Sequence, residues 1–157
     1  MKIELLIIGK NNFSFVDEGV RTYEDRLSRY VKFERRQVPD LKNAAALSVP
    51  ERRTKEGLLF LSLIEPSDFV VLLDEKGKEH TSKSFAAFLQ AKMNSGIKCL
   101  KFVVGGPYGF SDELYARANE KISLSKLTFP HDLVRVIFVE QLYRAFTIIK
   151  GEKYHHD

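Results

Sequence analysis

Several kinds of residue and segment are scarce in this sequence of 157 residues. It has one cysteine, Cys99, which excludes an internal disulfide framework and fits a reducing compartment. Its apolar runs are all much shorter than the roughly 20 residues of a membrane-spanning helix, and residues 1–8 lack the length and cleavage site of a secretory signal. We therefore expect a cytoplasmic protein with no membrane partner.

Several catalytic and ligand-binding motifs are also missing. His80 and His131 are isolated and no zinc-site spacing occurs, so no metal is expected. There is no G-x-S-x-G nucleophile motif, and the apolar surroundings of Cys99 suit a core position better than a catalytic one. The net charge of +4 permits nucleic-acid binding without showing it. The chemistry that remains is group transfer, in which loops orient a bound cofactor against a second substrate.

The chain alternates between short apolar runs and amphipathic segments, which predicts one α/β domain over residues 1–157. Strands are expected at Lys2–Ile8, Phe33–Val38 (at a sheet edge), Asp68–Leu73, Lys98–Val104 and Lys121–Ser125. Helices are expected at Ser14–Tyr30, Pro50–Glu65, Thr81–Ser95 and Asp132–Lys150, with a further helix capped by Ser111. Strands that alternate with helices in this way favour a mostly parallel sheet with flanking helices.

Three details of these elements are also predicted. Ser14 and Asp17 resemble a capping box at the start of the first helix. Four leucines of the second helical region are expected to face inward: Leu58, Leu59, Leu61 and Leu63. Residues 74–78 are expected to form an exit loop after the third strand.

A glycine-rich loop, Gly105–Gly109, follows the apolar run Phe102–Val104 directly. Glycine allows a ligand to approach the backbone closely, and open α/β sheets bind ligands at the carboxyl ends of their strands. No Walker or G-x-G-x-x-G pattern is present, so on spacing alone a tight turn is as good an interpretation as a binding loop. Two other strand ends, Leu73-Asp74 and Ser125–Pro130, could face the same crevice.

Basic residues are concentrated between Arg35 and Lys55, where six basic side chains accompany two acidic ones. This stretch is either a surface that contacts nucleic-acid phosphates, through residues such as Arg52 and Arg53, or a solvated loop and helix start. The tail from Lys153 onward combines an aromatic ring, imidazoles and a lysine. It is either functional or a frayed terminus.

The last predicted helix is apolar around nearly its whole circumference, which predicts burial on all sides. In a domain of this size, that pattern indicates a subunit interface in addition to the core. Arg135, Glu140 and Arg144 interrupt the apolar surface. They either pair inside an interface, where an unpaired charge is costly, or face a bound anion.

Four segments, VVGGPYGFS, SLSKLTFPHDLVRV, EQLYRA and the terminal YHHD, together resemble the ribosomal RNA large subunit methyltransferase H family, of the SPOUT class. The resemblance extends from the opening KIELLIIGK to the tail. It implies an α/β fold whose C-terminal part is tied in a trefoil knot, a homodimer, and S-adenosylmethionine as cofactor. It also implies methylation of N3 of a pseudouridine in 23S rRNA on the assembled ribosome.

The resemblance also implies site residues. The cofactor contacts would be Leu73, Gly106 with Gly105 shaping the turn, Ser125, Lys126, Leu127, Thr128, Phe129 and Pro130. Arg144, Tyr154 and His155 match positions linked to activity or RNA contact; His155 would accept the N3 proton, or Arg144 would stabilise the developing anion. Relatives commonly carry a basic residue after Tyr-His, whereas this chain has His156, which is largely neutral at pH 7.

Three other functions remain compatible with the sequence. The first is a SPOUT methyltransferase with a different RNA target. The second is a module that binds RNA or the ribosome without catalysis. The third is a nucleotide-binding regulator that holds a phosphate on the Gly105–Gly109 loop, which competition by ATP would distinguish because S-adenosylmethionine has no phosphate.

Overall fold

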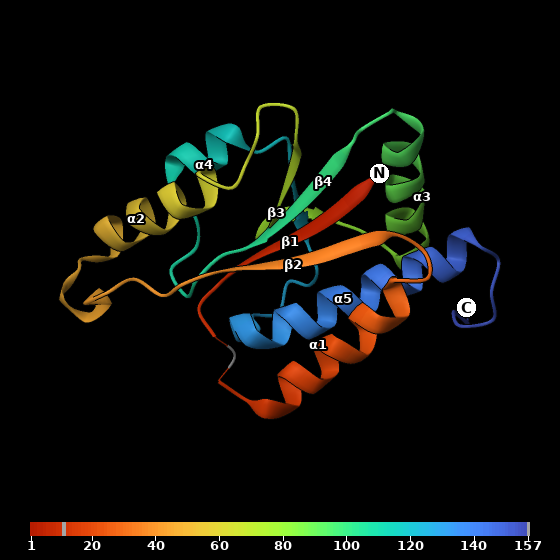
Figure 1. Ribbon diagram of the computed structural model, residues 1–157, viewed down its shortest axis with the longest axis horizontal. Coiled ribbons are helices and arrows are strands. Elements are labelled where there is room, and N and C mark those ends of the chain that lie inside the picture. Colours follow the sequence, from red (N-terminus) through yellow and green to blue (C-terminus); the bar gives the residue numbers. More distant parts are fainter. Residues whose placement is uncertain (11, 157) are drawn as a thin grey trace.

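A five-stranded parallel sheet forms the centre of the molecule, in a computed structural model that describes residues 1–10 and 12–156 (Figure 1). Its spatial order is β2-β1-β4-β3-β5, and every pairing between these strands is parallel. The strands are β1 (Lys2–Ile8), β2 (Lys32–Val38), β3 (Phe69–Glu79), β4 (Cys99–Val104) and β5 (Glu120–Ser123). The predicted α/β fold with a mostly parallel sheet is therefore confirmed, and the trefoil knot stays a prediction.

The helices lie on both faces of this sheet (Figure 1). They are α1 (Ser14–Leu27), α2 (Val49–Leu61), α3 (Ser82–Asn94), α4 (Asp112–Arg117) and α5 (His131–Ile149), with a short 3₁₀ helix at Ala44–Ala46. No helix within residues 1–10 and 12–156 has the length and apolar character needed to cross a membrane.

The first helix begins at Ser14 as predicted, but its predicted cap and its predicted end were wrong. Phe13 occupies the N-cap position without a side-chain cap, so Ser14 is already helical and forms no capping box with Asp17. The helix ends at Leu27 rather than Tyr30, because residues 28–30 leave the helix as a turn. Tyr30 nevertheless packs against Phe146, with ring centroids 6.1 Å apart, which explains why it continued the apolar pattern of the helix.

The third strand is longer than predicted. The expected exit loop at residues 74–78 belongs to β3, which continues to Glu79 with a shift in register against β5 between Leu73 and Lys78. Gly77 allows this pairing, because a Cβ at that position would lie 2.6 Å from the backbone of Ile122. The predicted edge position of β2 is confirmed.

Helix α2 begins with a capping box that the sequence interpretation overlooked. Ser48 accepts a hydrogen bond from the Glu51 backbone N–H, and the Glu51 carboxylate accepts one from the Ser48 backbone N–H. The prediction that the leucines all face inward was wrong for Leu58, which is 59% exposed. It lies two residues from the buried Phe60, about 200° around the helix.

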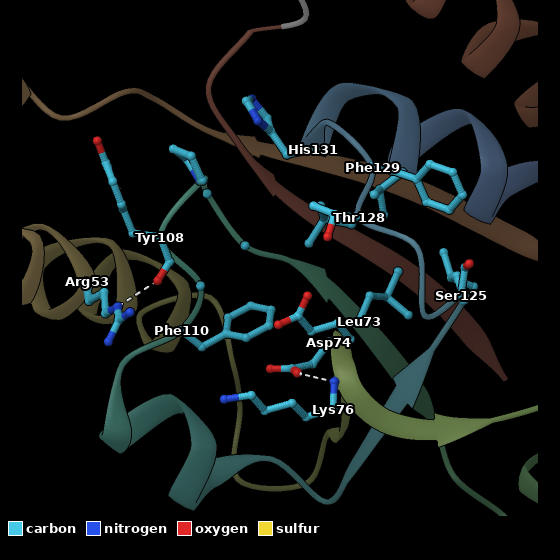
Figure 2. A pocket seen from close by; sticks show the side chains of 18 of the residues that line it. Arg53, Leu73, Asp74, Lys76, Tyr108, Phe110, Ser125, Thr128, Phe129 and His131 are labelled. Carbon is cyan, nitrogen blue, oxygen red and sulfur yellow. Dashed lines mark hydrogen bonds between the residues drawn. The ribbon is translucent and has the colours of Figure 1, made fainter.

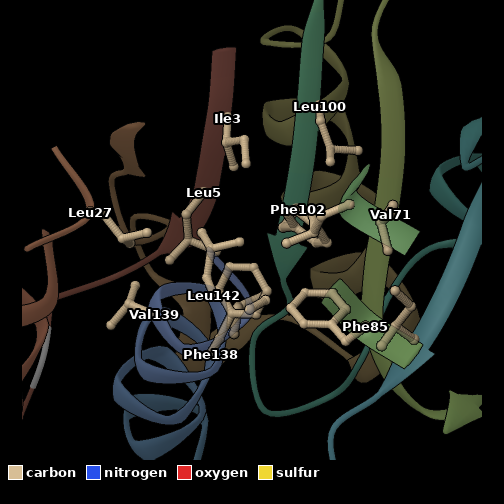
Figure 3. Packing of buried hydrophobic residues seen from close by; sticks show 14 of the residues in the cluster. Ile3, Leu5, Leu27, Val71, Phe85, Leu100, Phe102, Phe138, Val139 and Leu142 are labelled. Atoms are coloured by element: carbon tan, nitrogen blue, oxygen red, sulfur yellow. The ribbon is translucent and has the colours of Figure 1, made fainter. Parts of the chain in front are cut away.

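The sheet separates two hydrophobic cores, because alternate residues of each strand point to opposite faces. Ile3, Leu5 and Ile7 of β1 pack with α1, α3 and α5, and Leu6 and Ile8 pack on the face covered by α2 and α4. In the larger core the rings of Phe102 and Phe138 lie 4.6 Å apart between centroids (Figure 3).

Helix α5 is buried along one side and half-exposed along the other. Phe138, Val139, Leu142 and Phe146 are in the core, whereas the apolar residues of the opposite side are only partly covered within one chain. The latter are Leu133, Val134, Val136, Ile137, Tyr143, Ile148 and Ile149. Burial on all sides is therefore not achieved by a single chain, and the subunit interface stays a prediction.

Arg135 has neither of the two roles considered for it. Its side chain is fully buried and donates hydrogen bonds to the carbonyls of Ile8 and Gly9 at the end of β1. One guanidinium nitrogen lies 3.5 Å from the Asp132 carboxylate, and burial lowers the pKa of the arginine. Arg135 thus fixes the start of α5 against the end of β1.

Candidate functional site

A pocket of about 560 Å³ lies at the carboxyl end of β4 and beside residues 73–76 of β3 (Figure 2). Three chain segments provide most of its lining: residues 73–76, 104–110 and 124–129. A volume of several hundred Å³ with mixed apolar and polar lining is typical of small-molecule sites. The three strand ends that the sequence placed at one crevice therefore do line a single pocket.

The glycine-rich loop forms a turn in which Gly109 donates its N–H to the Gly106 carbonyl at 3.1 Å. Helix α2 holds this loop from the side: Arg53 Nε donates to the Tyr108 carbonyl at 2.6 Å, and the Arg52 guanidinium lies 5.0 Å from the centroid of the Tyr108 ring. Arg52 and Arg53 therefore both contact this loop, and their contact with nucleic-acid phosphates stays a prediction.

Glu56, which also belongs to α2, lies against the same loop at Gly106. It is 3% exposed, and its Oε1 accepts a hydrogen bond from Arg52 Nε at 2.8 Å. A Cβ built on Gly106 would lie 2.6 Å from Glu56 Oε2. Glycine is thus required at position 106 so that the loop can rest directly on this carboxylate.

Acidic groups line the wall of the pocket formed by the continuation of β3. Asp74 Oδ1 accepts a hydrogen bond from the Lys76 backbone N–H at 2.7 Å (Figure 2). Asp74 Oδ2 accepts one from the Tyr115 hydroxyl. Burial and the hydrogen bond to Asp74 raise the pKa of Tyr115 to about 12. Tyr115 therefore remains a donor at neutral pH, and Asp74, beside Glu75, favours a ligand with positive charge.

The third wall is a loop ordered by serine hydroxyls. Ser123 Oγ donates to the Ser125 carbonyl at 2.9 Å, and the Leu127 N–H donates to Ser125 Oγ at 2.9 Å. Seven residues that the sequence predicts as cofactor contacts line the pocket: Leu73, Gly105, Gly106, Ser125, Leu127, Thr128 and Phe129. Lys126 lies 3.5 Å from Glu79 in an exposed ion pair, and neither Lys126 nor Pro130 lines the pocket.

Arg144 and Tyr154 form a second cluster with Glu140. Arg144 donates to Glu140 Oε1 at 2.6 Å, and its guanidinium lies 4.7 Å from the centroid of the Tyr154 ring. The Tyr154 hydroxyl donates to the same carboxylate oxygen at 3.1 Å. Burial, with contributions from Tyr23 and Glu140, raises the pKa of Tyr154, so the hydroxyl keeps its proton.

This second cluster does not face the pocket of its own chain. A rise of about 1.5 Å per residue places Arg144 about 20 Å further along α5 than His131, which lines the pocket. In Figure 1, α5 starts beside the end of β1, and the C-terminal tail with His155 lies at the opposite end of the molecule. The structure therefore separates the predicted catalytic residues from the predicted cofactor residues within one chain.

The sequence interpretation missed His131 and Asp132, which follow the third loop at the start of α5. His131 lines the pocket, and its Nε2 lies 3.3 Å from Oδ1 of the buried Asp132. Their position directly after Pro130 at a helix start was the available signal, although His131 has no second histidine at metal-site spacing. In the part of the chain that the structure describes, no three histidine, cysteine, aspartate or glutamate side chains could together hold a metal ion.

These features define an α/β protein with a small-molecule pocket built from three loops at the carboxyl edge of a parallel sheet. Residues 1–155 match the family model described as "Predicted SPOUT methyltransferase". The chain belongs to the SPOUT methyltransferase family, and within it to the group of the ribosomal RNA large subunit methyltransferases H.

Curated relatives from three bacteria are similar over their whole length. The ribosomal RNA large subunit methyltransferase H of Christiangramia forsetii is 54% identical over 156 residues, 99% of each chain. The protein of that name from Parabacteroides distasonis is 51% identical over 157 residues, the full length of both. That of Flavobacterium psychrophilum is 51% identical over 99% of each chain.

Proposed function

We propose that the protein transfers a methyl group from S-adenosylmethionine to N3 of a pseudouridine in 23S rRNA on the assembled ribosome, in the cytoplasm. The observation that carries this proposal is the three-loop pocket in a chain that matches the SPOUT family model over residues 1–155. Relatives 45–54% identical to it are named for methylation of large-subunit ribosomal RNA, which supports the substrate class.

The pocket residues fit the proposed cofactor. Leu73, Val104 and Phe110 supply apolar surface for an adenosine group, and Asp74 and Glu75 supply negative charge for its cationic end. Backbone groups of the Gly105–Gly109 and 124–129 loops are available for hydrogen bonds that fix orientation. When bound, S-adenosylmethionine supplies an electrophilic methyl group, so the protein needs no covalent intermediate of its own.

The site is completed by a second copy of the chain. Arg144, Tyr154 and His155 are remote from the pocket of their own chain, and the uncovered side of α5 is apolar. Pairing of this side with a second copy would bury Leu133 and Ile137 and bring the Arg144 cluster of one protomer toward the pocket of the other. We therefore infer a homodimer whose sites combine residues from both protomers.

The residues of such a site would act on the RNA base. Arg144, already oriented by Glu140, would stabilise the negative charge that develops on the imide as N3 loses its proton. Tyr154 and His155 would hold the pseudouridine by stacking and hydrogen bonds, so that N3 faces the methyl group. Arg144 carries a permanent positive charge, so we assign this task to it.

Methyl transfer from labelled S-adenosylmethionine to ribosomes that lack this modification tests the proposal, with free 23S rRNA in parallel. We expect label in a single pseudouridine, and more of it on ribosomes than on free RNA. Cofactor binding without transfer would indicate a different RNA target. Absence of both binding and transfer would contradict the proposed enzyme and favour a non-catalytic ribosome-binding module.

Mixing two inactive variants tests whether the site is shared. Arg144→Ala removes the RNA-side cation, and Gly106→Val blocks the cofactor loop. In an equal mixture of re-associated dimers, we expect about a quarter of wild-type transfer, because half of the dimers would be mixed and each would keep one intact site. Mixing Gly106→Val with a second pocket variant, Thr128→Trp, is the control and should restore nothing. If the first mixture also restored nothing, the shared site would be wrong.

A further inference from the structure

We propose that His131, held by Asp132, is the group that accepts the N3 proton during methyl transfer. The inference rests on the proposed function and assigns within it a residue that neither the sequence motifs nor the comparisons single out. It starts from the pocket itself, because His131 is the only histidine of the described residues that lines the pocket.

The imidazole is placed for contact with a substrate. The His131 side chain is 31% exposed, and Figure 2 shows its ring at the rim, away from Leu73 and Asp74 at the bottom. A ligand in contact with Leu73 and the glycine loop would leave this rim to the second substrate. A proton acceptor must be within hydrogen-bond reach of the proton it removes. A position at the rim meets this requirement for a pseudouridine that enters the pocket from outside.

A buried carboxyl group lies behind the imidazole. Asp132 is 2% exposed, and its Oδ1 lies 3.3 Å from His131 Nε2. Its other oxygen, Oδ2, accepts hydrogen bonds from the backbone N–H and the amide of Asn12, at 3.1 and 2.9 Å. These two hydrogen bonds fix Oδ2. Among the described residues Oδ1 accepts no hydrogen bond, and it lies near both the imidazole and the Arg135 guanidinium.

An imidazole beside a buried carboxylate is the arrangement used for general bases, and the 3.3 Å separation would have to become a hydrogen bond in the substrate complex, where catalytic contacts tighten. With Nε2 directed at Asp132, the opposite nitrogen, Nδ1, is left to accept a proton. As N3 of the pseudouridine bonds to the methyl carbon, the carbon–sulfur bond breaks and its electron pair stays on sulfur. The N3 proton passes to Nδ1, and the Asp132 carboxylate stabilises the imidazolium that forms.

The Arg144 cluster is less suited to this step than to charge stabilisation. Its carboxylate, Glu140, is already shared by Arg144 and the Tyr154 hydroxyl. Charged groups on other elements line the same pocket as His131, and the pH profile of the rate includes their contribution. These are Arg53, Asp74, Glu75, Lys76 and Asp112; Arg35, Asp40 and Asp17 act on Arg135 behind Asp132.

Replacement of His131 tests the assignment. In His131→Gln we expect single-turnover methyl transfer to ribosomes to fall by about 100-fold or more, since a positioned general base contributes a factor of 10²–10⁴. The Kd for S-adenosylmethionine, measured by calorimetry, should change by less than about threefold, because the imidazole faces the second substrate. His80→Gln is the matched control and should keep wild-type rates, as His80 lies outside the pocket beside Phe85 and Phe88.

Two further measurements separate a base from a merely structural residue. The decline of the wild-type rate at acid pH that a general base causes should be absent in His131→Gln. Added imidazole should restore part of the rate in His131→Ala. A decline that persists in His131→Gln and disappears in His155→Gln would overturn the proposal in favour of His155. If wild-type enzyme methylates the ribosome and His131→Gln does so equally well, this inference fails while the proposed function stands.

Discussion

Replacing Lys101 by methionine should lower the free energy of unfolding by about 3–5 kcal/mol, the range for removal of one partner from a buried ion pair. Lys101 lies in β4 with a side chain only 4% exposed, and its Nζ is 3.1 Å from Glu4 Oε2 and 3.0 Å from Asp68 Oδ2. It also donates to the Leu63 carbonyl. Methionine keeps the length and most of the packing of lysine, so the loss would come from two buried carboxylates left without their shared cation.

Urea unfolding followed at one fixed protein concentration would measure this change, because association would otherwise alter the midpoint. Lys2→Met is the matched control. Lys2 also pairs with Glu4, at 2.5 Å, but its side chain is 28% exposed, and partly solvated pairs of this kind contribute about 1 kcal/mol or less. If Lys101→Met were no more destabilising than Lys2→Met, the buried cluster would not have the role assigned to it.

The same cluster makes stability depend on pH. Burial alone would raise the pKa of Glu4, but the hydrogen bonds and charges of Lys2 and Lys101 hold it below its ordinary value of 4.5. A depressed carboxyl pKa contributes stability above the unfolded value that is lost as pH falls through the folded one. The wild type should therefore lose this contribution on acidification below pH 4.5, and Lys101→Met should lose less.

The sheet and the location of the pocket were predictable because they depend on strong local signals. Apolar runs such as Lys2–Ile8 and Phe102–Val104 are long enough to be recognised as buried strands, and parallel strands bring their carboxyl ends to one edge. The Gly105–Gly109 loop therefore had to lie at that edge. The polar continuation of β3 to Glu79 lacked such a signal, because its pairing with β5 is decided by tertiary contacts.

Buried charged residues could not be placed from the sequence, because a charge in a helical segment does not show which other segment covers it. Glu56 and Arg135 are both buried against the backbone of other segments, one beside Gly106 and one at the end of β1. The role of Arg144 stays a prediction, and its separation from the pocket follows only from the uninterrupted course of α5. Such positions depend on contacts that are distant in sequence and cannot be deduced from spacing.

Gly106→Ala should weaken binding of S-adenosylmethionine by about tenfold to 100-fold, because overpacking of a tight contact costs about 1–3 kcal/mol. The new methyl group would lie 2.6 Å from Glu56 Oε2. Glu56 cannot retreat freely, since it is buried and its other oxygen is bound to Arg52. The strain is relieved most readily by displacement of the loop into the pocket, where it would compete with the cofactor. Calorimetric titration with S-adenosylmethionine would measure the effect.

The double variant Gly106→Ala with Glu56→Ala distinguishes this indirect clash from a direct one. Removing the carboxylate makes room for the new methyl group, so cofactor affinity should return to that of Glu56→Ala alone, and the two substitutions should be strongly non-additive. If affinity stays low in the double variant while its thermal unfolding matches that of Glu56→Ala, the methyl group must meet the cofactor itself. Unchanged affinity in Gly106→Ala alone would contradict the tight contact between loop and carboxylate. In the expected case, α2 would be shown to set the depth of the pocket through Glu56, without any contact of its own with the cofactor.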